Sequence, residues 1–213
     1  MKLALFDLDG TLIDSEEGIL ASIEYALARV GASSPPRAAL RAWIGPPLRA
    51  TFPLVLGEDE RRVEQAVGHY RERYGDLGWR EHRVYDGVGG LVEALAERGT
   101  ALAVVTTKVD LYAGRIVRSL PFGARFTQVY AASAGSRDSE KAAMIGRALA
   151  DFGVEPQHAA MIGDRHFDIE GARANAVRAI GVGWGFGSLE ELRDAGADAI
   201  AASPAALQAL LCP

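Results

Sequence analysis

The stretch FDLDGTLID, residues 6–14, continues the apolar run that begins at Leu3. A short unbroken apolar run of this kind is typical of a strand buried on both faces of a sheet. Two carboxylates, Asp7 and Asp9, stand at its end. Residues on one side of a strand recur at every second position, so both carboxylates are expected to project the same way. Two close carboxylates repel each other, and this repulsion raises the pKa of each carboxyl group unless a cation lies between them. The stretch is therefore a candidate ion site.

A second pair of acids follows a later apolar run, residues 159–162. The sequence GDRHFD places Asp164 and Asp168 just after that run. Because the carboxyl ends of parallel strands meet at one edge of a sheet, we expect these acids to converge with Asp7 and Asp9. Four acids offer only oxygen ligands, which favours a hard divalent cation and above all Mg²⁺.

Apolar runs alternate with helical patterns along most of the chain. This alternation predicts an α/β fold, a Rossmann-like parallel sheet core with helices on both faces. Residues 15–84 depart from it, because they contain helical stripes and no convincing strand. We therefore expect a catalytic core of residues 1–14 and 85–213, interrupted by a helical insertion at residues 15–84. An insertion directly after the first strand lies at the sheet edge where ligands bind. Strands are expected at residues 3–8, 101–106, 128–132, 159–162, 179–182 and 198–200.

The composition narrows the class of protein. The 213 residues are 49% hydrophobic and 24% charged, with a net charge of −5. This balance predicts a globular protein with no overall attraction for nucleic acid or an anionic membrane. A single cysteine, Cys212, allows no internal disulfide and fits a reducing compartment. The N-terminal apolar run is too short for a signal peptide, so a cytoplasmic location is expected.

The same sheet edge gathers groups suited to a phosphate. Thr106 and Thr107 end the run ALAVVT with hydroxyls and backbone amides, and Lys141 lies in the first turn of a helix expected from residue 139. A cation, hydroxyls and a helix N-terminus are what a phosphate needs. Gly10 lets the backbone approach closely, so its amide can also face a phosphate. Arg137 is a candidate for a second positive contact.

Taken in order, these motifs resemble the four motifs of the haloacid dehalogenase superfamily. The helical insertion resembles the small α-helical cap of that superfamily, and the resemblance covers nearly the whole chain. The four motifs are Asp7-x-Asp9-Gly10-Thr11-Leu12-x-Asp14-Ser15, Thr106, Lys141 and Gly163-Asp164-x-x-x-Asp168. Two further signatures resemble the phosphoglycolate-phosphatase-like branch: Gly45-Pro46-Pro47-Leu48-Arg49 and Tyr85-Asp86-Gly87-Val88.

The resemblance implies a role for each acid. Asp7 is then the nucleophile that forms an aspartyl-phosphate, and Asp9 is the general acid for the leaving oxygen and then the base for water. Mg²⁺ is held by the Asp7 carboxylate, the Asp9 backbone carbonyl and Asp164. Asp168 orients that shell, although Asp168 by itself also suits the cap of the next helix.

The resemblance also implies that Thr106 binds the transferred phosphoryl group and that Lys141 neutralises its charge. The chain departs from the family pattern twice. Thr107 stands where asparagine is frequent, and Lys141 lacks the proline that often follows. Lys108 is therefore a rival for the lysine role. We favour Lys141, because a helix N-terminus aims it at an anion.

Several residues carry two interpretations. Arg49 and Trp43 belong to the expected cap. Each either contacts the substrate or has a plain packing or surface role. The glycine-rich stretch of residues 181–187 lacks the spacing of a dinucleotide fingerprint, so we interpret it as a tight strand-to-helix loop. His166 lies inside the second acidic motif and is either adjacent to the site or a plain surface residue.

Three functions compete. The leading hypothesis is a Mg²⁺-dependent phosphatase acting on a small phosphorylated metabolite, such as phosphoglycolate, a nucleotide or a sugar phosphate. A phosphomutase of the same superfamily differs mainly in cap residues. A receiver-type phospho-acceptor module also combines acids, a threonine and a lysine, but its acceptor ends a middle strand with no helical insertion after the first. Neither nucleic acid nor membrane is expected as a partner, and the protein is expected to be a monomer or a homodimer.

Overall fold

In the computed structural model, which describes residues 1–133 and 141–212, the chain forms two compact units. The first comprises Met1–Asp14 and Val84–Pro213, and the second comprises Ser15–Arg83. That these units act as a catalytic core and a cap stays a prediction. Among the described residues, no helix is both long and apolar enough to cross a membrane.

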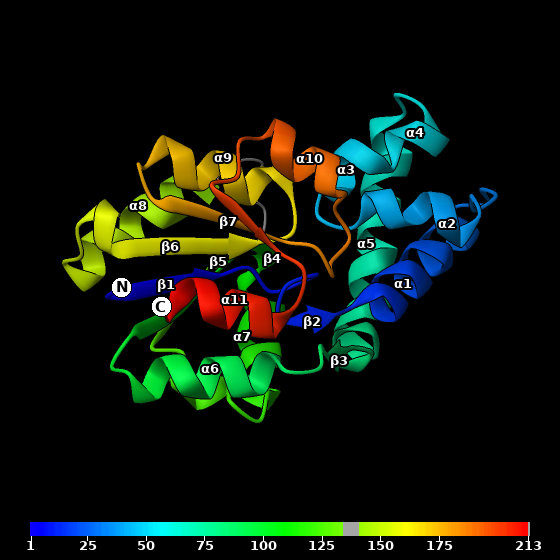
Figure 1. Cartoon of the computed structure of the whole chain (residues 1–213). Helices are drawn as coiled ribbons and strands as arrows, with labels where there is room; N and C mark the ends of the chain where they lie inside the picture. Colours follow the sequence, from blue (N-terminus) through cyan, green and yellow to red (C-terminus); the bar gives the residue numbers. More distant parts are fainter. Residues whose placement is uncertain (134–140, 213) are drawn as a thin grey trace. The chain divides into compact units, whose positions relative to one another are not determined.

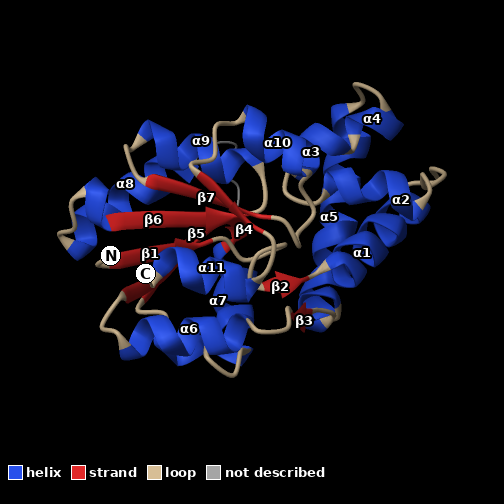
Figure 2. Cartoon of the chain, in the orientation of Figure 1, coloured by secondary structure: helices blue, strands red, loops and turns tan. Residues whose placement is uncertain are grey.

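The first unit is built on a six-stranded sheet in which every neighbouring pair of strands is parallel (Figure 2). This confirms the predicted α/β class. The order across the sheet is β5-β4-β1-β6-β7-β8. The strands are β1 Leu3–Phe6, β4 Ala101–Val109, β5 Gln128–Ala132, β6 Ala159–Gly163, β7 Arg178–Val182 and β8 Ala199–Ala201.

The first strand lies at the point where the strand order reverses. Phe6 of β1 pairs with Val104 of β4 on one side and with Ile162 of β6 on the other. From β1 the chain builds outward through β4 and β5, and then returns to build β6, β7 and β8 on the opposite side. Ligands of open α/β sheets bind at such a switch point, outside the carboxyl ends of the strands.

Helices cover both faces of this sheet. Helices α8 (Lys141–Phe152) and α9 (His166–Ala174) pack on one face, whereas α6 (Val88–Glu97) and α7 (Asp110–Ser119) pack on the other (Figure 1). Leu3 and Leu5 of β1 belong to the core cluster under α8 and α9, together with Ile145 and Ile169 of those helices. The helical elements of this unit are α6 Val88–Glu97, α7 Asp110–Ser119, η3 Gly123–Arg125, α8 Lys141–Phe152, η4 Pro156–His158, α9 His166–Ala174, α10 Leu189–Asp194 and α11 Pro204–Leu211.

The second unit is helical, as predicted for this stretch. Its two long helices, α1 and α5, pack against each other. The buried face of α1 includes Ile19, Leu20, Ile23 and Leu27, which recur at helical spacing. Its helical elements are α1 Glu16–Arg29, α2 Arg37–Leu40, η1 Arg41–Trp43, α3 Leu48–Thr51, α4 Pro53–Leu56, α5 Glu60–Asp76 and η2 Gly78–Arg80.

A separate two-stranded sheet of β2 Ile13–Asp14 and β3 Arg83–Val84 was not predicted, because two-residue strands carry no recognisable pattern.

Candidate active site

Asp7 continues the alternation of the first strand. Leu3 and Leu5 face α8 and α9, so the next side chain of the same parity, Asp7, turns toward the same helices. The Asp7 amide donates a hydrogen bond of 2.9 Å to the Ile162 carbonyl, which extends the pairing of β1 with β6 beyond the last strand residue. The strand pattern therefore delivers the Asp7 carboxylate to the start of the helices that follow β5 and β6.

Three carboxylates meet at this point. One carboxylate oxygen from each of Asp7, Asp164 and Asp168 lies within 4.8 Å of the other two. All three side chains are buried, with Asp164 and Asp168 fully inaccessible to solvent. Such a cluster of buried acids is unfavourable unless cations and hydrogen-bond donors compensate it.

Lys141 supplies one compensating charge. As the first residue of α8, it places its ammonium 2.8 Å from Asp7 Oδ2 and in contact with Asp168 Oδ1. Its side chain is buried, and burial alone lowers the pKa of a lysine. The carboxylates of Asp168 and Asp7 outweigh burial, so the pKa of Lys141 lies above its ordinary value. Lys141 is therefore a fixed cation beside Asp7.

Asp168 combines two tasks that the sequence presented as alternatives. Its Oδ1 contacts Lys141, and its Oδ2 accepts a hydrogen bond of 3.0 Å from the Arg165 amide. Arg165 is the N-cap of α9, so the second bond closes a capping box at the start of that helix. Both carboxylate oxygens of Asp168 are thus engaged within the chain, which suits a residue that orients the site.

Asp9 has a lysine partner of its own. Lys108 Nζ donates to both carboxylate oxygens of Asp9, at 3.0 and 2.8 Å. The register of β4 against β5 shifts between Thr106 and Val109, and such an irregularity re-aims side chains at a sheet edge. Within it, the Lys108 amide donates to the Thr106 hydroxyl oxygen at 3.2 Å. The two lysines are therefore not interchangeable, because they contact different acids.

The buried carboxylates fit a divalent cation. Oδ1 of Asp7 is buried and has no hydrogen-bond partner among the described residues. Burial raises the pKa of Asp7 to about 6, although Lys141 lowers it. Burial, with the charges of Asp168 and Asp7, raises the pKa of Asp164 well above its ordinary value. An unused carboxylate oxygen beside a second acid that resists ionisation is what a bound Mg²⁺ would relieve.

A pH dependence of stability follows from these shifts. In EDTA, the free energy of unfolding is expected to fall as the pH rises from about 4 to about 6. The pKa of Asp7 is about 6 in the folded protein against an ordinary 3.8, so the folded state holds a proton that the unfolded state has lost. Chemical denaturation across this window measures the effect, and Asp7→Asn should reduce it, leaving the part that comes from Asp164. Stability that rises across the same window would contradict the assignment.

The glycine-rich segment after β7 wraps Asp164. The Phe186 amide donates to Asp164 Oδ2 at 2.7 Å, and Trp184 Nε1 donates to the Thr11 carbonyl at 3.1 Å. A Cβ on Gly185 would overlap the Asp164 side chain and the Gly10 carbonyl. The predicted strand-to-helix loop is therefore also part of the site, and its sequence signal is the run of alternate glycines, of which Gly185 and Gly187 let the backbone approach Asp164.

Substituting one of these glycines should disturb the site. We expect Gly185→Ala to destabilise the protein by about 1–3 kcal/mol through overpacking against Asp164. Gly90→Ala is the matched control, since Gly90 is exposed in α6 and a Cβ there meets nothing within 4 Å. The control should be neutral or stabilising by up to about 1 kcal/mol. Equal unfolding midpoints for both variants in denaturant would contradict the close approach.

Gly10 differs from its predicted use. It adopts a φ of 81°, and its amide donates to the Ile13 carbonyl at 2.8 Å, within the turn that follows β1. The amide is thus engaged inside the chain. A Cβ at Gly10 would overlap the Asp164 carboxylate, so the glycine also provides clearance for that acid.

The remaining candidates belong to the second unit, to β4, to the start of α9 or to the stretch outside the described residues. Arg49 belongs to the second unit, where its guanidinium pairs with Glu64 at 2.5 and 2.9 Å. Thr107 is half-buried on β4, and Arg137 falls outside the described residues. Contacts of these three residues with substrate stay predictions. His166 lies beside the site, where its amide and its ring bond Glu191.

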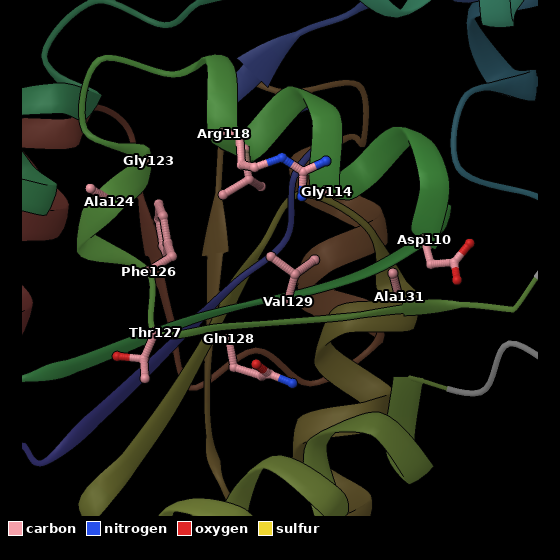
Figure 3. A pocket seen from close by; sticks show the side chains of 11 residues that line it. Asp110, Gly114, Arg118, Gly123, Ala124, Phe126, Thr127, Gln128, Val129 and Ala131 are labelled. Atoms are coloured by element: carbon pink, nitrogen blue, oxygen red, sulfur yellow. The ribbon is translucent and has the colours of Figure 1, made fainter.

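A hollow of about 520 Å³ lies elsewhere in the first unit (Figure 3). It is bounded by α7, by the η3 turn and by the edge strand β5, with Arg118 and Val129 among its lining residues. None of the clustered acids lines it. The hollow is therefore distinct from the candidate active site.

Comparison with known proteins identifies a family and several relatives that are similar to this chain. A family model described as haloacid dehalogenase-like hydrolase matches residues 4–182. A Pseudomonas aeruginosa protein named 5′-nucleotidase is 46% identical over 189 residues, which are 89% of this chain and 86% of that protein. Tyrosine-protein kinase PtkA of Mycobacterium tuberculosis is 36% identical over 187 residues, which are 87% of this chain but only 63% of that protein. A crystal structure of a predicted phosphatase from Clostridium acetobutylicum superposes with a TM-score of 0.92 at 35% identity, covering 99% and 97% of the two chains.

Proposed function

The chain belongs to the haloacid dehalogenase-like hydrolases and is a phosphoric monoester hydrolase; within this class, we propose that it is a Mg²⁺-dependent phosphatase that works through an aspartyl-phosphate on Asp7. The superfamily predicted from the motifs is thereby confirmed. The observation that carries the proposal is the buried Asp7 carboxylate, which has one oxygen on Lys141 and one oxygen unused among the described residues.

The reaction proceeds in two displacements. Asp7 attacks the phosphorus atom, the ester P–O bond breaks, and Asp9 gives a proton to the leaving oxygen. Asp9 then takes a proton from water, which attacks the phosphorus of the aspartyl-phosphate. The bond to Asp7 breaks, and inorganic phosphate leaves with the enzyme restored.

The residues around Asp7 stabilise the negative charge of the reacting groups, each in a different way. Lys141 faces the anionic nucleophile and neutralises charge on the transferred group, and the buried Thr106 hydroxyl orients that group. Mg²⁺ would be held by the Asp7 carboxylate, the Asp9 backbone carbonyl and Asp164. When bound, it shields the carboxylates from the anionic substrate and stabilises the charge that develops on the phosphoryl oxygens. Asp168 holds Lys141 and the turn in place.

The substrate is a small phosphate monoester, and 5′-nucleotides are the first class to test. The support is the 46% identity, over most of both chains, to a protein named 5′-nucleotidase. Phosphoglycolate, sugar phosphates and pyrophosphate complete the panel, since relatives named phosphoglycolate phosphatase and pyrophosphatase are 26–31% identical.

The test measures inorganic phosphate released from this panel and from p-nitrophenyl phosphate. We expect release with Mg²⁺, none after EDTA treatment, and recovery when Mg²⁺ is added in excess. Conversion of a sugar phosphate to its isomer without phosphate release would identify a phosphomutase instead. A stable phosphoprotein without turnover would point to the phospho-acceptor alternative. Failure to hydrolyse any ester in the presence of Mg²⁺ would overturn the proposal.

A further inference from the structure

Glu191 contacts the turn that carries the second pair of acids, although nothing in the sequence singled it out. It lies in the first turn of α10. Its Oε1 accepts three hydrogen bonds: 2.8 Å from Arg165 Nε, 2.9 Å from the His166 amide and 2.7 Å from His166 Nδ1. Its side chain is 23% exposed and that of Arg165 is 14% exposed, so these bonds are partly shielded from water.

The two residues that Glu191 binds come directly after Asp164. Arg165 is also the N-cap of α9, and its amide donates to Asp168 Oδ2. The carboxylate of Glu191 therefore restrains the backbone and side chains between the two acids. Among the described residues, Glu191 makes no hydrogen bond with Asp164 or Asp168.

Hydrogen bonds and short backbone segments together form a closed circuit. The Phe186 amide bonds Asp164, and Ser188, two residues later, caps α10 by accepting from the Glu191 amide at 3.0 Å. From Glu191 the circuit returns through Arg165 to Asp164. Burial disfavours the charge on Glu191, but bonds from the His166 amide, Arg165 and the His166 ring lower its pKa to about 2. Glu191 is thus an anion at neutral pH, matched to these donors.

We propose that Glu191 is a positioning residue for the metal site: it fixes the turn of residues 164–168 so that Asp164 presents its carboxylate beside Asp7. This inference rests on the proposed function, because the ion it serves is the proposed Mg²⁺. Outer partners of metal ligands commonly change metal affinity about 10–100-fold when they are replaced.

The variant Glu191→Gln keeps the size of the side chain and removes its charge. The matched control is Glu190→Gln, since Glu190 is exposed in the same turn and makes no ion pair or side-chain hydrogen bond within residues 1–133 and 141–212. In metal-free protein, hydrogen–deuterium exchange of the amides of residues 164–168 should accelerate in Glu191→Gln and stay unchanged in Glu190→Gln. Titration calorimetry with Mg²⁺ should show a Kd about 10-fold higher for Glu191→Gln.

The kinetic signature separates positioning from general loss of structure. The Mg²⁺ concentration for half-maximal turnover should rise in Glu191→Gln, while kcat at saturating Mg²⁺ stays near that of the parent protein. Arg165→Gln removes one of the three donors to Glu191 and should produce a smaller effect of the same sign. This variant replaces Glu191→Gln in the test if Glu191→Gln folds poorly. If hydrogen–deuterium exchange at residues 164–168 were unchanged in both Glu191→Gln and Arg165→Gln, the inference would be overturned, whatever the measured Kd for Mg²⁺. A parent protein that binds no Mg²⁺ while exchange still accelerates in Glu191→Gln would instead overturn the metal part of the proposed function, and with it the assignment of Glu191 to a metal site.

Discussion

Replacing Asp7 with asparagine is expected to reduce kcat by at least about four orders of magnitude, because the attacking carboxylate oxygen is replaced by an amide. The same variant should be more stable than the parent protein in EDTA at neutral pH. Burial raises the pKa of Asp7 to about 6, so ionised Asp7 opposes folding when no metal is present. The expected gain is on the order of 1–3 kcal/mol. Phosphate release and denaturant unfolding measure the two effects.

The combination of lost activity and gained stability is specific to a buried nucleophile in an acidic cluster. Asp76→Asn is the control, since Asp76 is exposed at the end of α5 and the same chemical change is made there. It should alter neither turnover nor the pH profile of stability. If Asp7→Asn kept more than about one per cent of kcat, the aspartyl-phosphate mechanism would be wrong, because the residual rate would need another nucleophile.

Of the four acids predicted to converge, Asp7, Asp164 and Asp168 do so because local rules determine their positions, whereas Asp9 pairs with Lys108. An apolar run that ends in Asp7 and another that ends just before Asp164 each identify a buried strand and its terminus. Parallel strands place their carboxyl ends together, and the pairing of Phe6 with Ile162 does so here. Alternation along the strand then turns Asp7 toward α8 and α9, where Lys141 begins its helix.

The partner of each lysine was not predictable in the same way. Lys108 and Lys141 are equally basic in sequence, and both were expected near the same edge. Their separation depends on a register shift in β4 after Thr106, which turns Lys108 to Asp9. Irregularities of this kind arise from pairing with a neighbouring strand, so the residues around Lys108 do not encode them locally.

The contacts that residues 185–191 make with Asp164 and the turn after it could not be predicted from the sequence either. Glu190 and Glu191 are adjacent identical residues on a short helix, yet one is exposed and the other accepts three hydrogen bonds from residues about 25 positions earlier. The alternate glycines before them were visible but were interpreted only as a tight loop. Their contact with Asp164 follows from tertiary packing between β7 and β6, which the pattern of one segment cannot specify.

Removing the charge of Lys141 should have the second large effect. We expect Lys141→Met to lower kcat about a thousandfold, since the cation facing Asp7 Oδ2 is lost where negative charge accumulates. The variant should also lose about 3–5 kcal/mol of stability at neutral pH, because Asp7 and Asp168 stay buried without their common partner. Lowering the pH to about 4 should restore part of that stability, as protonation of Asp7 removes the uncompensated charge.

Lys108→Met is the informative comparison, because it removes the same charge from the other acid. Lys108 and Asp9 form a less buried pair, with side chains 7% and 14% exposed, in which Lys108 donates to both carboxylate oxygens of Asp9. The loss of orientation at Asp9 should slow turnover about 10–100-fold, with a smaller loss of stability than in Lys141→Met. Steady-state kinetics at saturating Mg²⁺ and unfolding at two pH values decide the order. If Lys108→Met proved the more damaging change, Lys108 would be the lysine that neutralises the phosphoryl group, and Lys141 would be left with a structural task at Asp168.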